Sequence, residues 1–309
     1  MNLCLVPTSP YDFDLTMRIH NVHPGEVVDN YVNCVYRRVL NAEEEHVLVS
    51  VKSIGTVDEP ELRVSVHTSI PSKLEEEVRR KLEHMLSTDA DLQGFYSAIS
   101  KDRVLTQIAN ELYGLRATRT ESLFEALVIA ITEQQISLKA AVAIRGRIAR
   151  RCGNRVVLRG REYYSFPSER SMTRARIQHL RDSGLSGKKV EYIVGLSREA
   201  ASGRLDLEKM IGLPTEEIIS ELTKIRGVGR WTAEYAVARG LGRFDALPAD
   251  DAALRRAVSA LYYGEREVTG EEVRRLLDKY GQYKGYAAFY LLGLELLGCE
   301  SLTNGLRYR

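Results

Sequence analysis

Cysteine is scarce in this sequence, and its few copies are scattered. The four cysteines form no C-x-x-C pair and have no histidine at ligand spacing; they are Cys4, Cys34, Cys152 and Cys299. Zinc sites and iron–sulfur clusters need several such ligands in a recognisable spacing. The sequence therefore predicts neither zinc nor an iron–sulfur cluster, and a reducing cytosol is the expected location.

Long apolar runs are also missing. No segment reaches the roughly 18 apolar residues of a membrane span, and the first residues, MNLCLVPTSPYDFDL, contain no basic leader region. Strong charge of one sign is absent too, since 44 Lys and Arg residues face 42 Asp and Glu residues. We expect no membrane partner, and the overall charge indicates no polyanionic ligand.

The chain is long enough for about two domains, because 309 residues with 44% hydrophobic side chains can bury a substantial core. Residues 46–55 and 61–70 alternate apolar and polar side chains, which predicts half-buried antiparallel strands. Residues 27–40 fit either a strand or a helix. Ser72 and Glu75 have the spacing of a capping box, so we expect a helix to begin there.

Beyond Asp89 the strand signals vanish and we expect only helices. Two of them flank the break Glu133-Gln134-Gln135-Ile136, the first ending near Thr132 and the second beginning near Ser137. Basic residues are concentrated just after this break, and they fit either a solvated helix face or a flank that faces phosphates. These residues are Arg145, Arg147, Arg150, Arg151, Arg155, Arg159, Arg161, Arg174, Arg176, Arg181, Lys188 and Lys189.

The stretch ELTKIRGVGRWTAEYAVARGL has the pattern of two helices joined by a G-x-G turn. Glycines permit positive φ and leave backbone N–H groups uncovered, so these groups can bind a phosphate together with the start of the second helix. Such a hairpin holds a nucleic-acid backbone whatever its sequence. The same pattern also fits a plain tight turn. The predicted contacts are Gly227, Val228, Gly229, Arg230 and Thr232.

Two aromatic residues and two carboxylates follow the turn closely. Trp231, the only tryptophan, opens the second helix and Tyr235 lies one turn later on the same face. They are either ordinary core residues or a platform on which an extruded nucleobase stacks. Asp250 and Asp251 precede a further helix. A carboxylate there is a normal helix cap, which also fixes its orientation for chemistry.

These segments carry a family resemblance. IRGVGRWTAEY followed by LPADDAALRRA resembles the helix-hairpin-helix (HhH-GPD) DNA glycosylases, closest to the 3-methyladenine DNA glycosylase II, or AlkA-type, enzymes. The similarity extends through PYDF, FEALVIAITEQQISLKAA, FPSERSMTRARIQHLRDSGLSGKKVEYI and YGQYKGYAAFYLLG. It implies an α+β fold with a small antiparallel-sheet domain at residues 1–90 and a helical glycosylase domain at 91–309. Within the latter, 118–243 would form the hairpin subdomain, and 91–117 with 244–309 the second helical subdomain.

The resemblance also implies roles for single residues. Asp251 matches the catalytic aspartate, with Asp250 as the near alternative. Trp231 stands where bifunctional relatives have a Schiff-base lysine, which implies hydrolysis without strand cleavage, and Tyr235 matches a pocket aromatic. Gln135 matches the side chain that wedges into the vacated base stack.

Two further features are implied less directly. Family hairpins bind a monovalent cation through backbone carbonyls, here those of Thr223, Ile225 and Val228, and no other cofactor is expected. The segment Phe289-Tyr290-Leu291-Leu292 departs from the bacterial aromatic pattern of the pocket wall, which puts base specificity in doubt.

The expected function is that of a monofunctional glycosylase acting on alkylated purines in damaged double-stranded DNA. An N3- or N7-alkylated purine already carries positive charge, so it leaves without protonation, and one carboxylate near C1′ is enough. The alternatives are a glycosylase for oxidised or deaminated purines, or a non-catalytic DNA-binding hairpin module. We expect a monomer in the cytoplasm of a prokaryotic cell, associated with the nucleoid when it acts.

Overall fold

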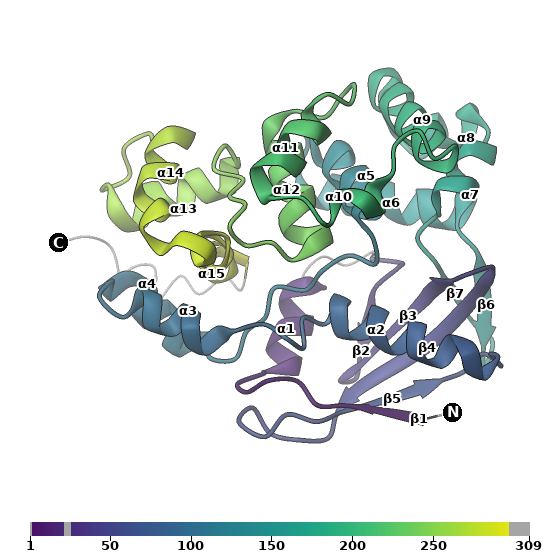
Figure 1. Ribbon diagram of the computed structural model, residues 1–309, viewed down its shortest axis with the longest axis horizontal. Helices are drawn as coiled ribbons and strands as arrows, with labels where there is room; N and C mark the ends of the chain where they lie inside the picture. The colour runs from purple at the N-terminus through teal and green to yellow at the C-terminus, as the bar shows by residue number, and fades with distance from the viewer. Residues whose placement is uncertain (1, 22–25, 297–309) are drawn as a thin grey trace.

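The structure is a computed structural model that describes residues 2–21 and 26–296; Cys299 lies outside these residues. It combines one five-stranded sheet near the N-terminus with a larger helical part (Figure 1). The expected α+β fold class is confirmed. No helix among the described residues is long and apolar enough to cross a membrane.

The N-terminal sheet is antiparallel throughout, in the order β1-β5-β4-β3-β2. The ambiguous segment 27–40 forms two strands joined at Asn33 and Cys34, both with positive φ, as tight hairpin turns require. The strands are β1 (Asn2–Leu5), β2 (Asn30–Val32), β3 (Val35–Ala42), β4 (Glu45–Ser53) and β5 (Leu62–Val66).

Helices α1 (Phe13–His20) and α2 (Glu75–Met85) cover one face of this sheet, where their apolar side chains join those of β4 and β5 in one cluster (Figure 1). The expected capping box at Ser72 is wrong. Ser72 instead begins a short 3-10 turn, η1 (Ser72–Leu74), and the N-cap of α2 is Leu74, which has no side chain able to accept a hydrogen bond.

The other face of the sheet is covered by a feature that the sequence did not predict. Strands β6 (Arg155–Leu158) and β7 (Arg161–Tyr164) form a hairpin within the helical part of the chain. Tyr163 of this hairpin packs on Val39 and Leu48, which are cross-strand partners in β3 and β4. The expectation of helices alone beyond Asp89 is therefore wrong.

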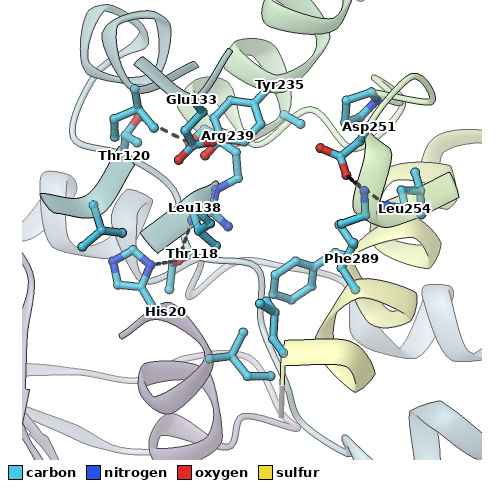
Figure 2. A pocket seen from close by; sticks show the side chains of 18 of the residues that line it. His20, Thr118, Thr120, Glu133, Leu138, Tyr235, Arg239, Asp251, Leu254 and Phe289 are labelled. Atoms are coloured by element: carbon cyan, nitrogen blue, oxygen red, sulfur yellow. Dashed lines mark hydrogen bonds between the residues drawn. The ribbon is translucent and has the colours of Figure 1, made fainter. Parts of the chain in front are cut away.

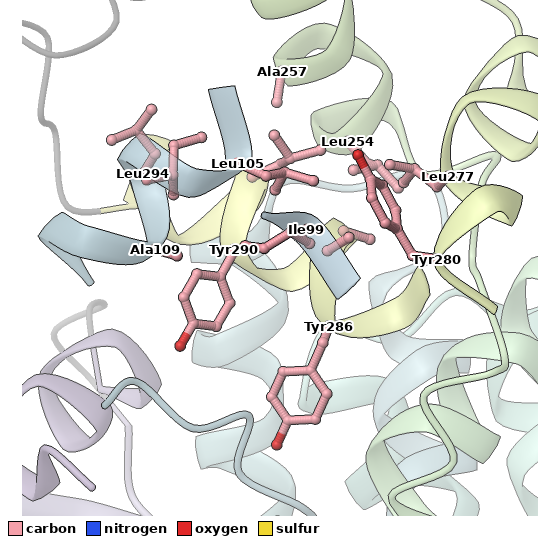
Figure 3. Packing of buried hydrophobic residues seen from close by; sticks show 14 of the residues in the cluster. Ile99, Leu105, Ala109, Leu254, Ala257, Leu277, Tyr280, Tyr286, Tyr290 and Leu294 are labelled. Carbon is pink, nitrogen blue, oxygen red and sulfur yellow. The ribbon is translucent and has the colours of Figure 1, made fainter. Parts of the chain in front are cut away.

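The helical part has two apolar clusters. One contains α3, α4 and α13–α15, shown in Figure 3, and the other is built around α5, α6, α9, α11 and α12. Leu15 and Ile19 of α1 belong to the first cluster, so the N-terminal region contributes directly to a helical core. The bounds are α3 (Leu92–Ile99), α4 (Arg103–Glu111), α5 (Leu123–Glu133), α6 (Leu138–Cys152), α7 (Glu169–Arg174), α8 (Ile177–Asp182), α9 (Gly187–Ala201), α10 (Leu207–Met210), α11 (Thr215–Thr223), α12 (Arg230–Leu241), α13 (Ala252–Tyr262), α14 (Gly270–Leu277), η2 (Asp278–Tyr283) and α15 (Lys284–Leu296).

Helices α5 and α12 cross closely because small residues meet at the crossing. A Cβ placed on Gly240 of α12 would lie 3.0 Å from both the Cβ of Ala126 and the Cα of Leu123. This close packing fixes the end of α5 relative to the start of α12, where the predicted site residues are found.

Candidate active site

A cavity of about 1230 Å³ lies between the two helical clusters (Figure 2). Its walls come from the ends of α5 and α12, the loop before α13, one face of α15 and the end of α1. Five residues singled out in the sequence line it: Gln135, Trp231, Tyr235, Asp250 and Asp251.

Asp251 is the N-cap of α13. Its Oδ1 accepts hydrogen bonds from the backbone N–H groups of Ala253 and Leu254, both at 2.9 Å. These bonds and the positive end of the helix stabilise an ionised carboxylate in one orientation. Figure 2 shows the carboxylate facing the interior of the cavity. The neighbouring Asp250 is exposed, and its Oδ1 lies next to the Cα of Gly270, at the start of α14.

The aromatic platform is present on α12. The rings of Trp231 and Tyr235 have centroids 5.6 Å apart and planes inclined by 39°, and both side chains line the cavity. The Nε1–H of Trp231 is buried without a hydrogen-bond acceptor among the described residues. Burial raises the pKa of the Tyr235 hydroxyl, and the nearby charge of Glu133 raises it further, so Tyr235 is neutral.

Phe289 of α15 supplies a facing wall that sequence reasoning did not identify (Figure 2). Phe289 and Leu292 line the cavity, whereas Tyr290 is buried in the adjoining core and donates a hydrogen bond to the carbonyl of Leu115 at 2.8 Å. The C-terminal segment therefore contributes one aromatic residue to the cavity.

A second carboxylate, also missed, lies at the end of α5. Glu133 accepts a hydrogen bond from Arg145, which also forms an ion pair with Glu26 at 3.4 Å. Burial raises the pKa of the Glu133 carboxyl, an effect that Arg145 opposes and the charge of Asp251 reinforces. Arg145 is 12% exposed, so this member of the basic group is an internal partner of carboxylates rather than a phosphate-facing residue.

Polar side chains of three segments meet at one end of the cavity. Arg239 of α12 donates a hydrogen bond to the hydroxyl of Thr118 at 3.2 Å, and that hydroxyl lies 2.9 Å from Nδ1 of His20. His20 in turn lies 3.3 Å from Asp29, which accepts two hydrogen bonds from Arg38, at 2.8 and 2.9 Å. This chain of contacts joins the cavity to the N-terminal sheet.

The hairpin glycines differ from one another. Gly227 has φ +91°, and a Cβ there would lie 2.2 Å from the ring of Tyr192. Gly229 has φ −85° and is the exposed N-cap of α12; a Cβ there would meet nothing within 4 Å. Because glycine has no capping side chain, the first N–H groups of α12 have no side-chain acceptor from their N-cap.

The other predicted hairpin contacts are engaged within the protein. Arg230 forms ion pairs with Glu216 and Glu234, at 3.1 and 2.8 Å. Thr232 is buried, and its hydroxyl accepts a hydrogen bond from the Gln134 side chain at 3.0 Å. Its side chain is therefore not available on the surface for a DNA contact.

Gln135 is exposed between α5 and α6 with φ +56°, at the rim of the cavity. The exposed apolar side chains of Ile136 and Leu138 lie next to it in the chain. In the hairpin, the carbonyl of Ile225 accepts the N–H of Val228 at 3.0 Å. A carbonyl oxygen has two lone pairs, so this bond leaves one of them for the expected cation, together with the carbonyls of Thr223 and Val228.

The hairpin and the aspartate-capped helix on either side of an aromatic cavity define a helix-hairpin-helix protein with a pocket of the size of a nucleobase. The sequence model of the HhH-GPD superfamily base excision DNA repair proteins matches residues 128–282. The chain therefore belongs to the HhH-GPD superfamily, and the family predicted from the sequence is confirmed.

Individual relatives agree with this membership. The chain is 29% identical over 293 residues to a DNA-3-methyladenine glycosylase of Bacillus subtilis, covering 94% of this chain and 97% of that protein. It is 28% identical over 178 residues to DNA-3-methyladenine glycosylase 2 of Escherichia coli, covering 58% and 60% of the two chains. The solved structure of the 3-methyladenine DNA glycosylase from Archaeoglobus fulgidus superposes with a TM-score of 0.85 at 29% identity, covering 95% and 98%. The protein is a DNA glycosylase of this superfamily.

Proposed function

We propose that this protein is a monofunctional DNA glycosylase, which extrudes alkylated purines of the 3-methyladenine and 7-methylguanine type from duplex DNA and removes them by hydrolysis. The observation that carries the proposal is the position of Asp251, an oriented carboxylate that faces a cavity walled by Trp231, Tyr235 and Phe289. The names of its relatives support the same class of damaged base.

The chemistry requires little more than this carboxylate. As the glycosidic bond breaks, positive charge develops on the sugar around C1′, and a fixed anion nearby stabilises it. Asp251 has this role and also orients the water that completes the hydrolysis. An alkylated purine leaves as a neutral base, because its positive charge is removed when the bonding electrons return to the ring, so no general acid is required.

The aromatic walls favour the damaged base. The face of an indole or phenol ring attracts a cation, by roughly 0.5–2 kcal/mol. Trp231 and Tyr235 thus bind a cationic purine better than a neutral one, and a damaged pair also costs less to open. No lysine is among the described residues that line the cavity, which supports hydrolysis without a Schiff base.

The hairpin supplies the backbone contact with the double-stranded DNA partner. The exposed Gly229 and the first N–H groups of α12 bind a phosphate near the extruded nucleotide, with the monovalent cation bound by the turn. All walls of the cavity come from one chain, which supports action as a monomer. We place this activity in the cytoplasm of a prokaryotic cell, at the nucleoid.

A panel of duplexes, each with one damaged base, tests the proposal. Base release is scored with and without subsequent alkali, and we expect release of alkylated purines with strand cleavage only after alkali. Preferential release of oxidised or deaminated purines would contradict the substrate class. Tight DNA binding without any base release would instead indicate a non-catalytic hairpin module.

A further inference from the structure

We propose that Glu133 reads the amino-bearing edge of the extruded base and selects purines that combine positive charge with a hydrogen-bond donor. The inference rests on the proposed function and deepens it, because it names the part of the base that is recognised. The role is one of specificity: Glu133 contacts the base, and Asp251 remains the group that acts at the sugar.

Glu133 is in the right place for this role. It lines the cavity from the last residue of α5, and Figure 2 shows it beside Tyr235 and Arg239, across the cavity from Asp251. A nucleotide with its C1′ near Asp251 would place its base between the aromatic walls and direct the far edge of the base toward Glu133. The two carboxylates are close enough for the charge of Asp251 to act on Glu133.

One of the two carboxylate oxygens is available. Arg145 donates to Oε1 of Glu133, and among the described residues no hydrogen bond is made to Oε2. Oε2 is also not among the fully buried polar atoms that lack a partner. The side chain is 13% exposed, and the exposure is toward the cavity. An N–H group of a bound base can therefore reach Oε2 without breaking an existing bond.

The local charge favours a cationic base. One arginine, Arg145, neutralises two carboxylates, those of Glu26 and Glu133, so this group of three residues carries one excess negative charge. Asp251 adds another negative charge, and Arg239 compensates for one of the two. A cation bound in the cavity restores neutrality, which a neutral base does not.

The hydrogen-bonding pattern of the base then decides between purines. Adenine has an amino group at C6, and guanine has an amino group at C2 beside a ring N–H, so both offer donors to a carboxylate. Hypoxanthine has a carbonyl oxygen at C6 and no amino group. Its oxygen would repel Glu133, so deaminated purines are rejected while alkylated adenine and guanine are accepted.

The single tryptophan allows a direct binding test. Trp231 lines the cavity, so its fluorescence, excited where tyrosine does not absorb, reports occupation of the pocket by a small molecule. The probes are 7-methylguanosine in mildly acidic buffer, where its ring is cationic, and inosine as the neutral nucleoside without an amino group. We expect the wild-type protein to prefer 7-methylguanosine, and Glu133→Gln to reduce this preference by about tenfold to a hundredfold.

Two further variants separate recognition from structure. Glu26→Gln removes the other carboxylate partner of Arg145 and should leave the preference unchanged. Glu133→Asp keeps the charge near Arg145 but withdraws it from the base, and should give an intermediate preference. It also provides the test if thermal unfolding shows that Glu133→Gln does not fold.

The same variants are then compared for base release from duplexes containing 7-methylguanine or hypoxanthine. A lower ratio of the two kcat/KM values in Glu133→Gln than in the wild type supports the inference. An unchanged nucleoside preference in folded Glu133→Gln, or equal or absent binding of both nucleosides by the wild type, overturns it. A wild-type protein that shows the nucleoside preference but releases no alkylated base would refute the proposed function and leave the recognition by Glu133 standing.

Discussion

The side chain of Gln134 donates a hydrogen bond to the backbone carbonyl of Gly227, at 3.0 Å. This bond ties the loop that carries Gln135 to the turn of the hairpin. Lys189 strengthens the loop by donating to the carbonyls of Thr132 and Gln134, at 2.8 and 2.7 Å. The two segments expected to contact DNA therefore form one connected surface rather than two independent loops.

Gln135→Gly should reduce base release from a stable base pair more than from a mismatched one. A wedge fills the gap left by the extruded nucleotide, and unpairing a stable pair costs a few kcal/mol more. Glycine is preferable to alanine because Gln135 has φ +56°, which a Cβ disfavours. Single-turnover rates on the two duplexes measure the effect. Gln135→Asn, which tolerates this conformation, is the control and should lose less; equal losses on both duplexes would show that the residue only links two helices.

Gly229→Ala should weaken binding to damaged and undamaged DNA alike, by about tenfold, since its Cβ would occupy the space that a phosphate approaches. The added Cβ meets no protein atom within 4 Å, so the fold should be unaffected. Fluorescence anisotropy at low salt measures the affinity, and unchanged affinity would refute the backbone clamp.

Gly227→Ala is predicted to act through stability instead. The new Cβ would lie 2.2 Å from the Tyr192 ring, at a residue with φ +91°. We expect a loss of roughly 1–3 kcal/mol in the free energy of unfolding. Thermal unfolding of the two glycine variants side by side distinguishes the roles, and a stable Gly227→Ala with weakened DNA binding would reverse this assignment.

Asp251→Asn should reduce base release by at least about a hundredfold and leave the fold and DNA binding intact. Asparagine is an equally good N-cap, so it keeps the hydrogen bonds to Ala253 and Leu254 but removes the charge near C1′. Asp250→Asn is the matched control and should cost far less. The opposite order of the two variants would place the catalytic carboxylate one residue earlier.

Borohydride should trap no covalent complex between the wild-type protein and damaged DNA. Trp231 occupies the position of a Schiff-base lysine, and the amine of Lys284 is paired with Asp278 at 3.0 Å. The strand should stay intact until alkali is added, as denaturing gels can show. A strong trapped complex would contradict hydrolysis, and its loss in Lys284→Gln would identify the amine.

Asp29→Asn should destabilise the protein by about 3 kcal/mol near neutral pH, because it leaves the buried Arg38 without one of its partners. Burial alone would raise the pKa of Asp29, but Arg38 and His20 hold it well below its ordinary value of 3.8. A carboxyl whose pKa is lowered in the folded state stabilises the fold above its unfolded pKa, and this contribution is lost as the pH falls through the folded value.

The difference between wild type and Asp29→Asn should therefore shrink below about pH 4, which urea unfolding at several pH values can measure. Glu43→Gln, which breaks an exposed ion pair with Lys73 on the same domain, is the control and should change stability by less than about 1 kcal/mol. A constant difference at every pH would show that packing rather than charge is responsible.

The sequence was sufficient to predict the fold class, because strands such as β4 and β5 alternate with period two and the helices beyond residue 90 have clear end signals. The β6–β7 hairpin was missed because its strands have only four residues each and are rich in arginine, so they have the composition of a solvated helix face. Short strands depend on what covers them, here the sheet residues Val39 and Leu48, and that information is distant in the sequence.

The site could be predicted only where a local signal marks it. Trp231, Tyr235 and Asp251 are within a few residues of a glycine turn or a proline, and all three line the cavity. Phe289 lies in α15, which is apolar on all sides, so its spacing does not reveal which face lines the cavity. Glu133 was recognised only as part of a break between helices, since its partners Arg145 and Glu26 come from other elements.

The β6–β7 hairpin also has a consequence for protein engineering. It packs on the outer face of the N-terminal sheet, where Ser165 forms a bridge with Val39, although the chain enters and leaves it from helices. The N-terminal unit is therefore encoded in two separate stretches of the gene. A chimera that exchanges residues 1–90 with those of a relative must exchange Arg155–Tyr164 as well, or one face of the transplanted sheet will meet a hairpin shaped for a different surface.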